Sequence, residues 1–131
     1  MFKHCLILLL FMLPVSASAH SPLVSLSPQD GASLDQTPSQ IEMVFKSPAK
    51  LIKVDMLKLT ASNNDSLFGS LFGGSEGDEI SLQEDFLMKV AEKHIIALPS
   101  LISGNYSVSW RAMGQDGHLI KGDFSFAVTG N

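Results

Sequence analysis

Apolar side chains recur at every second residue in short runs along this chain. The clearest run lies near the C-terminus, where Tyr106, Val108 and Trp110 alternate with two serines and an arginine. A period of two places successive side chains on opposite faces of a β-strand, so we expect strands rather than amphipathic helices. The segments predicted to form strands are residues 23–26, 41–45, 52–59, 86–90, 94–98, 106–113 and 124–128. Seven short strands predict an all-β sandwich or small barrel, although residues 82–93 also fit a short helix.

Turn-forming residues separate these runs. Clusters of Pro, Gly, Asp and Asn predict turns at 27–31, 37–38, 103–105 and 115–117. Residues 61–79 are rich in Ser, Asn, Asp and Gly and contain a tandem Ser-Leu-Phe-Gly, so we expect a long loop there. Two interpretations of its Phe68 and Phe72 stay open: the rings pack onto the edge of the sandwich, or they form a docking surface for a partner.

The first nineteen residues have the pattern of a cleaved secretory signal. Lys3 and His4 form a polar start, residues 5–13 an apolar run, and Ala17-Ser18-Ala19 a small-residue cleavage site. The apolar run is shorter than the roughly 20 residues that a membrane-spanning helix needs. We therefore expect residues 1–19 to be removed and residues 20–131 to form one exported domain without a membrane span.

Charge and cysteine content exclude several classes of function. The chain has 9 Lys and Arg against 13 Asp and Glu, and loss of Lys3 moves the net charge from −4 to −5. Such a balance argues against nucleic acid and anionic membranes as partners. The single cysteine, Cys5, leaves with the signal, so we expect neither disulfides nor thiolate chemistry in the mature domain.

Cleavage after Ala19 would make His20 the N-terminal residue. A terminal histidine offers its α-amine and its ring Nδ1 to one metal ion, and the amine, with a pKa of about 7.7 to 8.0, releases its proton near neutral pH. Pro22 has no N–H and therefore blocks a run of backbone amide ligands. Further ligands must come from elsewhere in the fold.

Asp116-Gly117-His118 is the candidate source of those ligands. A carboxylate and an imidazole two residues apart project to one side of an extended segment. Together with His20 they form a set of three nitrogens and one oxygen, which suits tetragonal Cu(II). Asp-Gly is also a common hairpin turn, and a lone histidine after it is often simply exposed, so the tripeptide alone leaves both interpretations open.

At this point the sequence resembles the CopC-type periplasmic copper-binding proteins over nearly the whole mature chain. The residues that carry the resemblance are His20, LVS at 23–25, SPQDGA at 27–32, TP at 37–38, IEMVF at 41–45, LISGNYSVSWRA at 101–112, DGH at 116–118, Gly122 and residues 124–128. The resemblance implies a Greek-key immunoglobulin-like β-sandwich or barrel, export to the periplasm, and Cu(II) held by His20, Asp116 and His118.

The chain departs from that family pattern in two places. Many members carry an acidic residue near the copper, two positions after Phe45, where this chain has Ser47. Some members bind Cu(I) in a loop rich in Met, whereas residues 61–79 here contain neither Met nor His. We interpret the four scattered methionines as core residues. They are Met43, Met56, Met88 and Met113.

Three functional classes follow. The first is a copper carrier or buffer that exchanges Cu(II) with an inner-membrane copper transporter or another periplasmic copper protein. The second is an interaction domain with a degenerate metal site that uses Phe68 and Phe72. The third is a copper oxidase built on the N-terminal histidine. We expect no catalytic residues, because no nucleophile and base pair or phosphate loop is evident.

The remaining candidate residues are expected to be structural. His94 lies in an apolar run and is predicted to be exposed or hydrogen-bonded on its strand, without a role in the metal site. Trp110 is predicted to pack in the core, and Arg111 to be solvated or ion-paired on the opposite face.

Overall fold

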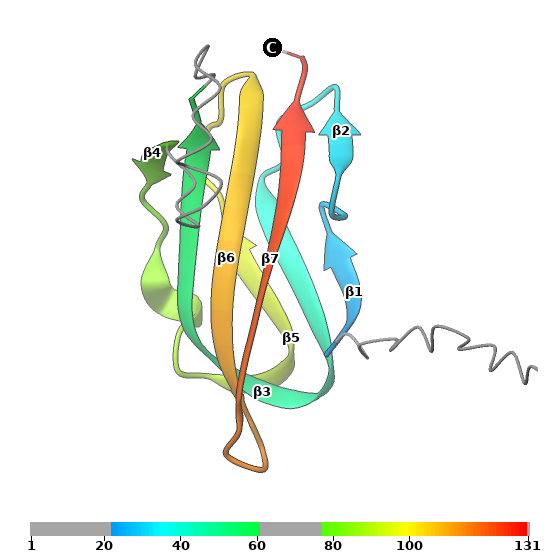
Figure 1. The fold of residues 1–131 in the computed structure, drawn as a ribbon, viewed down its shortest axis with the longest axis vertical. Coiled ribbons are helices and arrows are strands. Elements are labelled where there is room, and N and C mark those ends of the chain that lie inside the picture. The colour runs from blue at the N-terminus through cyan, green and yellow to red at the C-terminus, as the bar shows by residue number, and fades with distance from the viewer. Residues whose placement is uncertain (1–21, 61–76, 131) are drawn as a thin grey trace, which may run out of the picture.

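The computed structural model describes residues 22–60 and 77–130, which form mainly β-strands. One 3-10 helix, η1, interrupts the strands before β5 (Figure 1). The elements are β1 (Leu23–Ser27), β2 (Ala32–Leu34), β3 (Gln40–Leu59), β4 (Gly77–Ile80), η1 (Glu84–Phe86), β5 (Val90–Ala97), β6 (Gly104–Gly114) and β7 (Leu119–Val128).

The long strand β3 belongs to both layers of the fold. Its first part pairs antiparallel with β1 and β5, and its second part, from Ala49 onward, pairs with β6 and, near its end, with β4. The register with β5 is irregular between Val44 and Ala49, where β3 passes from one layer to the other. β7 extends the second layer beside β6, and β2 adds a parallel edge strand next to β7. The result is a strongly curled all-β sheet (Figure 1), which confirms the predicted fold class.

The core lies between the two layers and follows the alternation seen in the sequence. Along β6, alternate residues from Tyr106 to Ala112 are buried, and the residues between them face outward. The Trp110 ring packs edge-on against Phe45 with centroids 5.4 Å apart, which confirms its predicted place in the core. Gly122 lies opposite Trp110 on β7, and a Cβ there would come within 2.6 Å of the indole. This position therefore needs glycine for the tryptophan to pack.

A tyrosine near the start of β6 fixes the preceding turn. The Tyr106 hydroxyl donates a hydrogen bond to the carbonyl of Ile102, four residues upstream, and burial raises the pKa of this phenol. A tyrosine with this contact is a hallmark of immunoglobulin-like sandwiches.

Several predicted boundaries were wrong. Residues 41–45 and 52–59 are parts of the single strand β3. Residues 86–89 hold the end of η1 and a turn, and Val90 is already the first residue of β5. The alternative prediction of a short helix within 82–93 corresponds to the 3-10 helix η1. The short strands β2 and β4 were missed because three or four residues are too few to show a period. The interpretations of Phe68 and Phe72 lie outside the described residues.

Candidate metal centre

Asp116 and His118 lie in the tight turn that joins β6 to β7. The strands pair as far as Met113 and Leu119, and the Gly114 N–H then donates to the His118 carbonyl at 3.0 Å. The Gly117 N–H donates to the Gly114 carbonyl, also at 3.0 Å, and Gly117 adopts a φ of +80°. Glycine reaches this left-handed conformation without the cost that a Cβ imposes. The predicted turn at 115–117 is therefore confirmed.

This turn holds the carboxylate of Asp116 against His118 through both oxygens. Asp116 Oδ1 accepts a hydrogen bond from the His118 backbone N–H at 3.0 Å, and Oδ2 lies 2.8 Å from His118 Nδ1. When Nδ1 carries the proton that binds Asp116, Nε2 is the ring nitrogen with a free lone pair. The two side chains do meet as expected, but the turn brings them together, not an extended segment.

The contact shifts both pKa values. The hydrogen bond to His118 lowers the pKa of Asp116, and the same bond together with the carboxylate charge raises the pKa of His118. The side chains are 67% and 84% exposed, so solvent screens this pair and it adds little to stability. Its main effect is to fix the direction of the imidazole ring.

The start of the described chain lies at the same end of the sheet as this turn (Figure 1). The Lys46 N–H donates to the Pro22 carbonyl at 3.0 Å, and Leu23 pairs with Phe45. Because Ala49 of the same strand pairs with Gly114, the β3 bend connects the entry of β1 with the base of the turn. His20 itself lies outside the described residues. In the described part of the chain, no group of three or more His, Cys, Asp and Glu side chains is gathered.

The bend of β3 presents polar side chains directly after Phe45. Lys46 and Ser47 are both exposed there. Neither side chain is acidic, so Asp116 and His118 stay the candidate ligands among the described residues.

His94 is buried and does not belong to this pair. Its Nε2 lies 2.9 Å from the Ala49 carbonyl and 3.0 Å from the Ala91 carbonyl, so an Nε2–H bridges two residues that face each other across β3 and β5. Its ring meets Phe45 edge-on, with centroids 5.6 Å apart. Of the two predicted roles, exposed or hydrogen-bonded, the second is found, and His94 fastens the β3 bend.

Two of the four methionines were assigned wrongly. Met43 and Met56 are fully buried, but Met88 is 62% exposed and Met113 is 37% exposed. Strand alternation places Met113 on the outer side of β6, because Ala112 before it points inward, and this signal was available in the sequence. Met88 follows η1 at a positive φ of 63°, which no periodicity could reveal.

Comparison with known proteins defines the class. The fold described above is a β-sandwich with an Asp-Gly-His turn. The sequence model of the CopC domain matches residues 23–129 of this chain. The chain belongs to the CopC family. It is 29% identical over 125 residues to the copper transport protein CutJ of Bacillus subtilis, a match that takes in 94% of this chain but only 21% of that protein. The chain thus spans about a fifth of the length of this relative.

Solved structures show the same fold. CopC from Methylosinus trichosporium OB3b superimposes with a TM-score of 0.56 at 21% identity, over 83% of this chain and 93% of that one. PcoC, a methionine-rich copper resistance protein from Escherichia coli, gives a TM-score of 0.58 at 19% identity, over 82% and 96%. Within the described residues, no helix is long and apolar enough to cross a membrane.

Proposed function

We propose that this protein is an exported copper carrier that binds Cu(II) through the α-amine and ring of His20, with Asp116 and His118 completing the site. The observation that carries the proposal is the Asp116 to His118 hydrogen bond of 2.8 Å on a turn at the end of the sheet where the described chain starts. The bond keeps the two proposed ligands next to each other and, by fixing the tautomer of His118, leaves its Nε2 lone pair for the ion.

The relatives support copper as the cargo. CutJ is named a copper transport protein and PcoC a copper resistance protein, and the chain shares its family or fold with both. Two imidazoles, an amine and a carboxylate oxygen favour Cu(II) over Cu(I), since none of these ligands is a soft sulfur. The exposure of Asp116 and His118 suits a carrier, because a second protein can reach the ion directly.

The proposal also places the mature protein in the periplasm, with residues 1–19 removed as the signal. Removal of the signal is required for the chemistry, because an amide nitrogen in place of the His20 α-amine binds a metal ion only after it loses its N–H proton, which costs far more than deprotonating the amine. An inner-membrane copper transporter or another periplasmic copper protein then exchanges the ion with it.

Electron paramagnetic resonance of Cu(II) titrated into two proteins tests the proposal. One protein begins at His20, and the other carries a single extra residue before His20; a third with one extra residue at the C-terminus is the matched control. We expect one tight tetragonal nitrogen-rich signal in the first and third proteins, and its loss in the second. Equal weak binding in all three would overturn the proposed site.

A further inference from the structure

The outer face of the sheet next to the Asp116 turn is unusually apolar. Four side chains form a row across β5, β3, β6 and β7 in direct register: Val90, Lys50, Met113 and Leu119. Val90 is 60% exposed and Leu119 is 57% exposed. Met88 extends the row, since its N–H donates to the carbonyl of Leu51, the neighbour of Lys50. Most of the exposed large hydrophobic side chains in the described part of the chain therefore lie in this one area.

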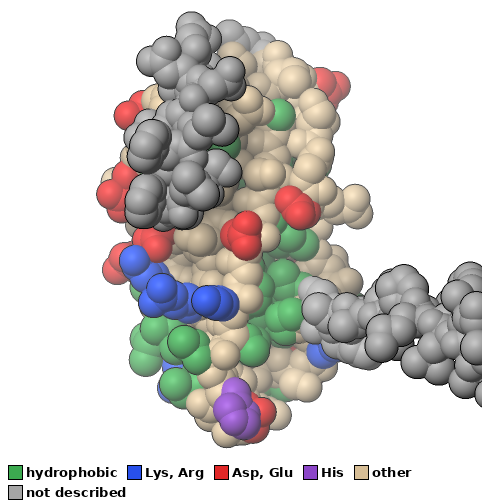
Figure 2. Space-filling view, viewed as in Figure 1, with side chains coloured by type: hydrophobic (Ala, Val, Ile, Leu, Met, Phe, Trp, Pro, Cys, Tyr) green, Lys and Arg blue, Asp and Glu red, His purple; other side chains and the backbone are tan. Residues whose placement is uncertain are grey.

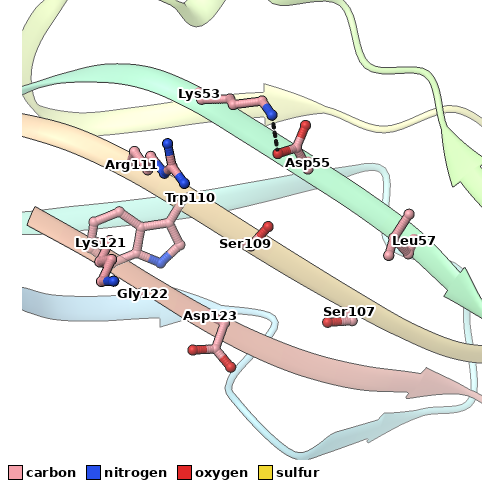
Figure 3. A pocket seen from close by; sticks show the side chains of 10 residues that line it. All are labelled: Lys53, Asp55, Leu57, Ser107, Ser109, Trp110, Arg111, Lys121, Gly122 and Asp123. Atoms are coloured by element: carbon pink, nitrogen blue, oxygen red, sulfur yellow. Dashed lines mark ion pairs between the residues drawn. The ribbon is translucent and has the colours of Figure 1, made fainter. Parts of the chain in front are cut away.

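A row of basic side chains follows directly behind the apolar row. Lys53, Arg111 and Lys121 are register partners on β3, β6 and β7. Lys53 forms an ion pair of 2.9 Å with Asp55, while no ion pair involving Arg111 or Lys121 is found among the described residues. The three cations line one end of a pocket of about 570 Å³. Figure 3 shows their side chains, with Asp55 and Asp123 one row farther along the strands.

These rows are ordered outward from the candidate metal centre. Figure 2 shows hydrophobic and then basic side chains between the histidine at the lower end and the acidic side chains farther up. With Lys50, this area holds four of the nine Lys and Arg residues of a chain whose net charge is −4. The two rows hold no acidic side chain, so their charge is opposite in sign to that of the whole protein, which favours approach of an acidic surface to this face.

We propose that this face is the docking surface for the protein that exchanges copper with the Asp116 and His118 turn, and that this partner presents an apolar patch flanked by carboxylates. We define the docking face as Lys50, Met88, Val90, Arg111, Leu119 and Lys121. The proposal rests on the proposed function. Direct transfer requires a partner ligand to reach the copper, so the partner must cover the surface that flanks the turn.

The composition of the face fits a protein partner. Methionine side chains adapt to different contact shapes, and an arginine beside exposed apolar groups is typical of protein interfaces. The acidic row of Asp55 and Asp123, together with the net charge of −4, disfavours an anionic bilayer. The spatial order of the apolar, basic and acidic rows also gives the complex a single orientation, because a reversed partner would place like charges together.

Site-specific photocrosslinking in copper-treated cells of the source organism tests the proposal. A benzophenone amino acid replaces Leu119 in the docking face or, as the matched control, Ile102, which is 64% exposed and lies at the opposite end of β6. The same experiment is repeated with Arg111→Glu and Lys121→Glu together, and with Lys93→Glu as a reversal outside the face. Adducts are identified by mass spectrometry.

We expect position 119, but not position 102, to crosslink to a copper protein through an acidic segment, and the double reversal to lower the yield at least about tenfold while Lys93→Glu does not. Reversing the contacted carboxylates to lysine in the partner should restore crosslinking to the double variant. Equal adducts at both positions, an adduct only with a second copy of this chain or with lipid, or a yield unaffected by the double reversal would overturn the proposal. The Cu(II) spectrum of each variant separates this outcome from failure of the copper site itself.

Discussion

The two histidines of the described domain lie near the same end of the fold but in opposite surroundings. His94 is buried at the β3 bend, where Nε2 bridges two backbone carbonyls. His118 is exposed on the β6 to β7 turn, where Asp116 takes Nδ1. The same side chain is thus a structural fastener in one place and a candidate ligand in the other. The two residues differ in the state of Nε2. In His118 it is free for a metal ion, whereas in His94 it is buried and already bonds two carbonyls, so it cannot reach an ion.

Replacing His118 by Ala should produce the largest effect on copper and almost none on folding. Loss of one of two imidazole ligands should weaken Cu(II) affinity at least about a hundredfold, or about 2.8 kcal/mol. A titration against a competing chelator measures this change, and thermal unfolding of the copper-free protein should be unaffected, because the side chain is 84% exposed. Unchanged affinity would remove His118 from the site.

His94→Ala is the reciprocal test. It leaves the Ala49 and Ala91 carbonyls without their partner and opens a space beside Phe45, which should lower the free energy of unfolding by about 3 kcal/mol. For a domain of this size that corresponds to a fall in Tm of about 10 °C. Circular dichroism measures it. Copper affinity at a temperature where the variant is folded should match that of the unaltered protein, and a large loss there would contradict the separation of the two roles.

The pair that His118 forms with Asp116 can be weakened without removing either side chain. Asp116→Asn should lower the pKa of His118 toward its ordinary value, because the carboxylate is what raises it. The ion pair stabilises the fold below the unfolded-state pKa of histidine and is lost as the pH rises through the raised pKa, a small effect at an exposed site. Ring nitrogen chemical shifts followed against pH in the copper-free protein give the pKa. We also expect affinity for Cu(II) to fall at least about tenfold, because the proposed oxygen ligand loses its charge and the ring loses the partner that orients it. An unchanged His118 pKa would show that the hydrogen bond is absent in solution.

Gly117→Ala should have the smallest effect. A Cβ at this position meets nothing within 4 Å, so only the strain of a φ of +80° opposes it. That strain costs about 1 kcal/mol. Chemical denaturation measures the loss of stability. A loss of several kcal/mol would mean that the turn supports more of the fold than its two glycine hydrogen bonds indicate.

The fold class could be predicted from the sequence because alternation is strong wherever one face of a strand is buried. It was clearest in β6, where the inward and outward positions of Tyr106 to Met113 follow directly from the spacing. It failed over 86–89, where Phe86, Leu87 and Met88 belong to η1 and a turn, because one buried side chain, Phe86, is enough to hold so short a helix to the core. The continuity of β3 was also hidden, since Lys46-Ser47-Pro48 resembles a loop in sequence but is a bend within the strand.

The sequence predicted which residues form the candidate site, but not how their side chains contact each other. Asp116 and His118 were identified by their spacing and by the family resemblance, and the structure brings them together. Their contact depends on the turn geometry at Gly117, and a spacing of two residues alone does not predict that geometry. The docking face was missed for a different reason: Val90, Lys50 and Leu119 come from three strands, and only the pairing register brings them into one row.

Because β3 passes through both layers, a hydrogen-bonded strand and not a loop connects the layers at one end of the domain. At the β3 bend the two layers are joined by one continuous strand, whereas at the opposite end they are joined by connecting segments such as residues 98–103 between β5 and β6. The end that carries the Asp116 turn is thus the mechanically stiff end of the molecule. A partner that pulls on this turn while withdrawing an ion loads covalent bonds and ladder hydrogen bonds in β3, β6 and β7, and the core stays closed.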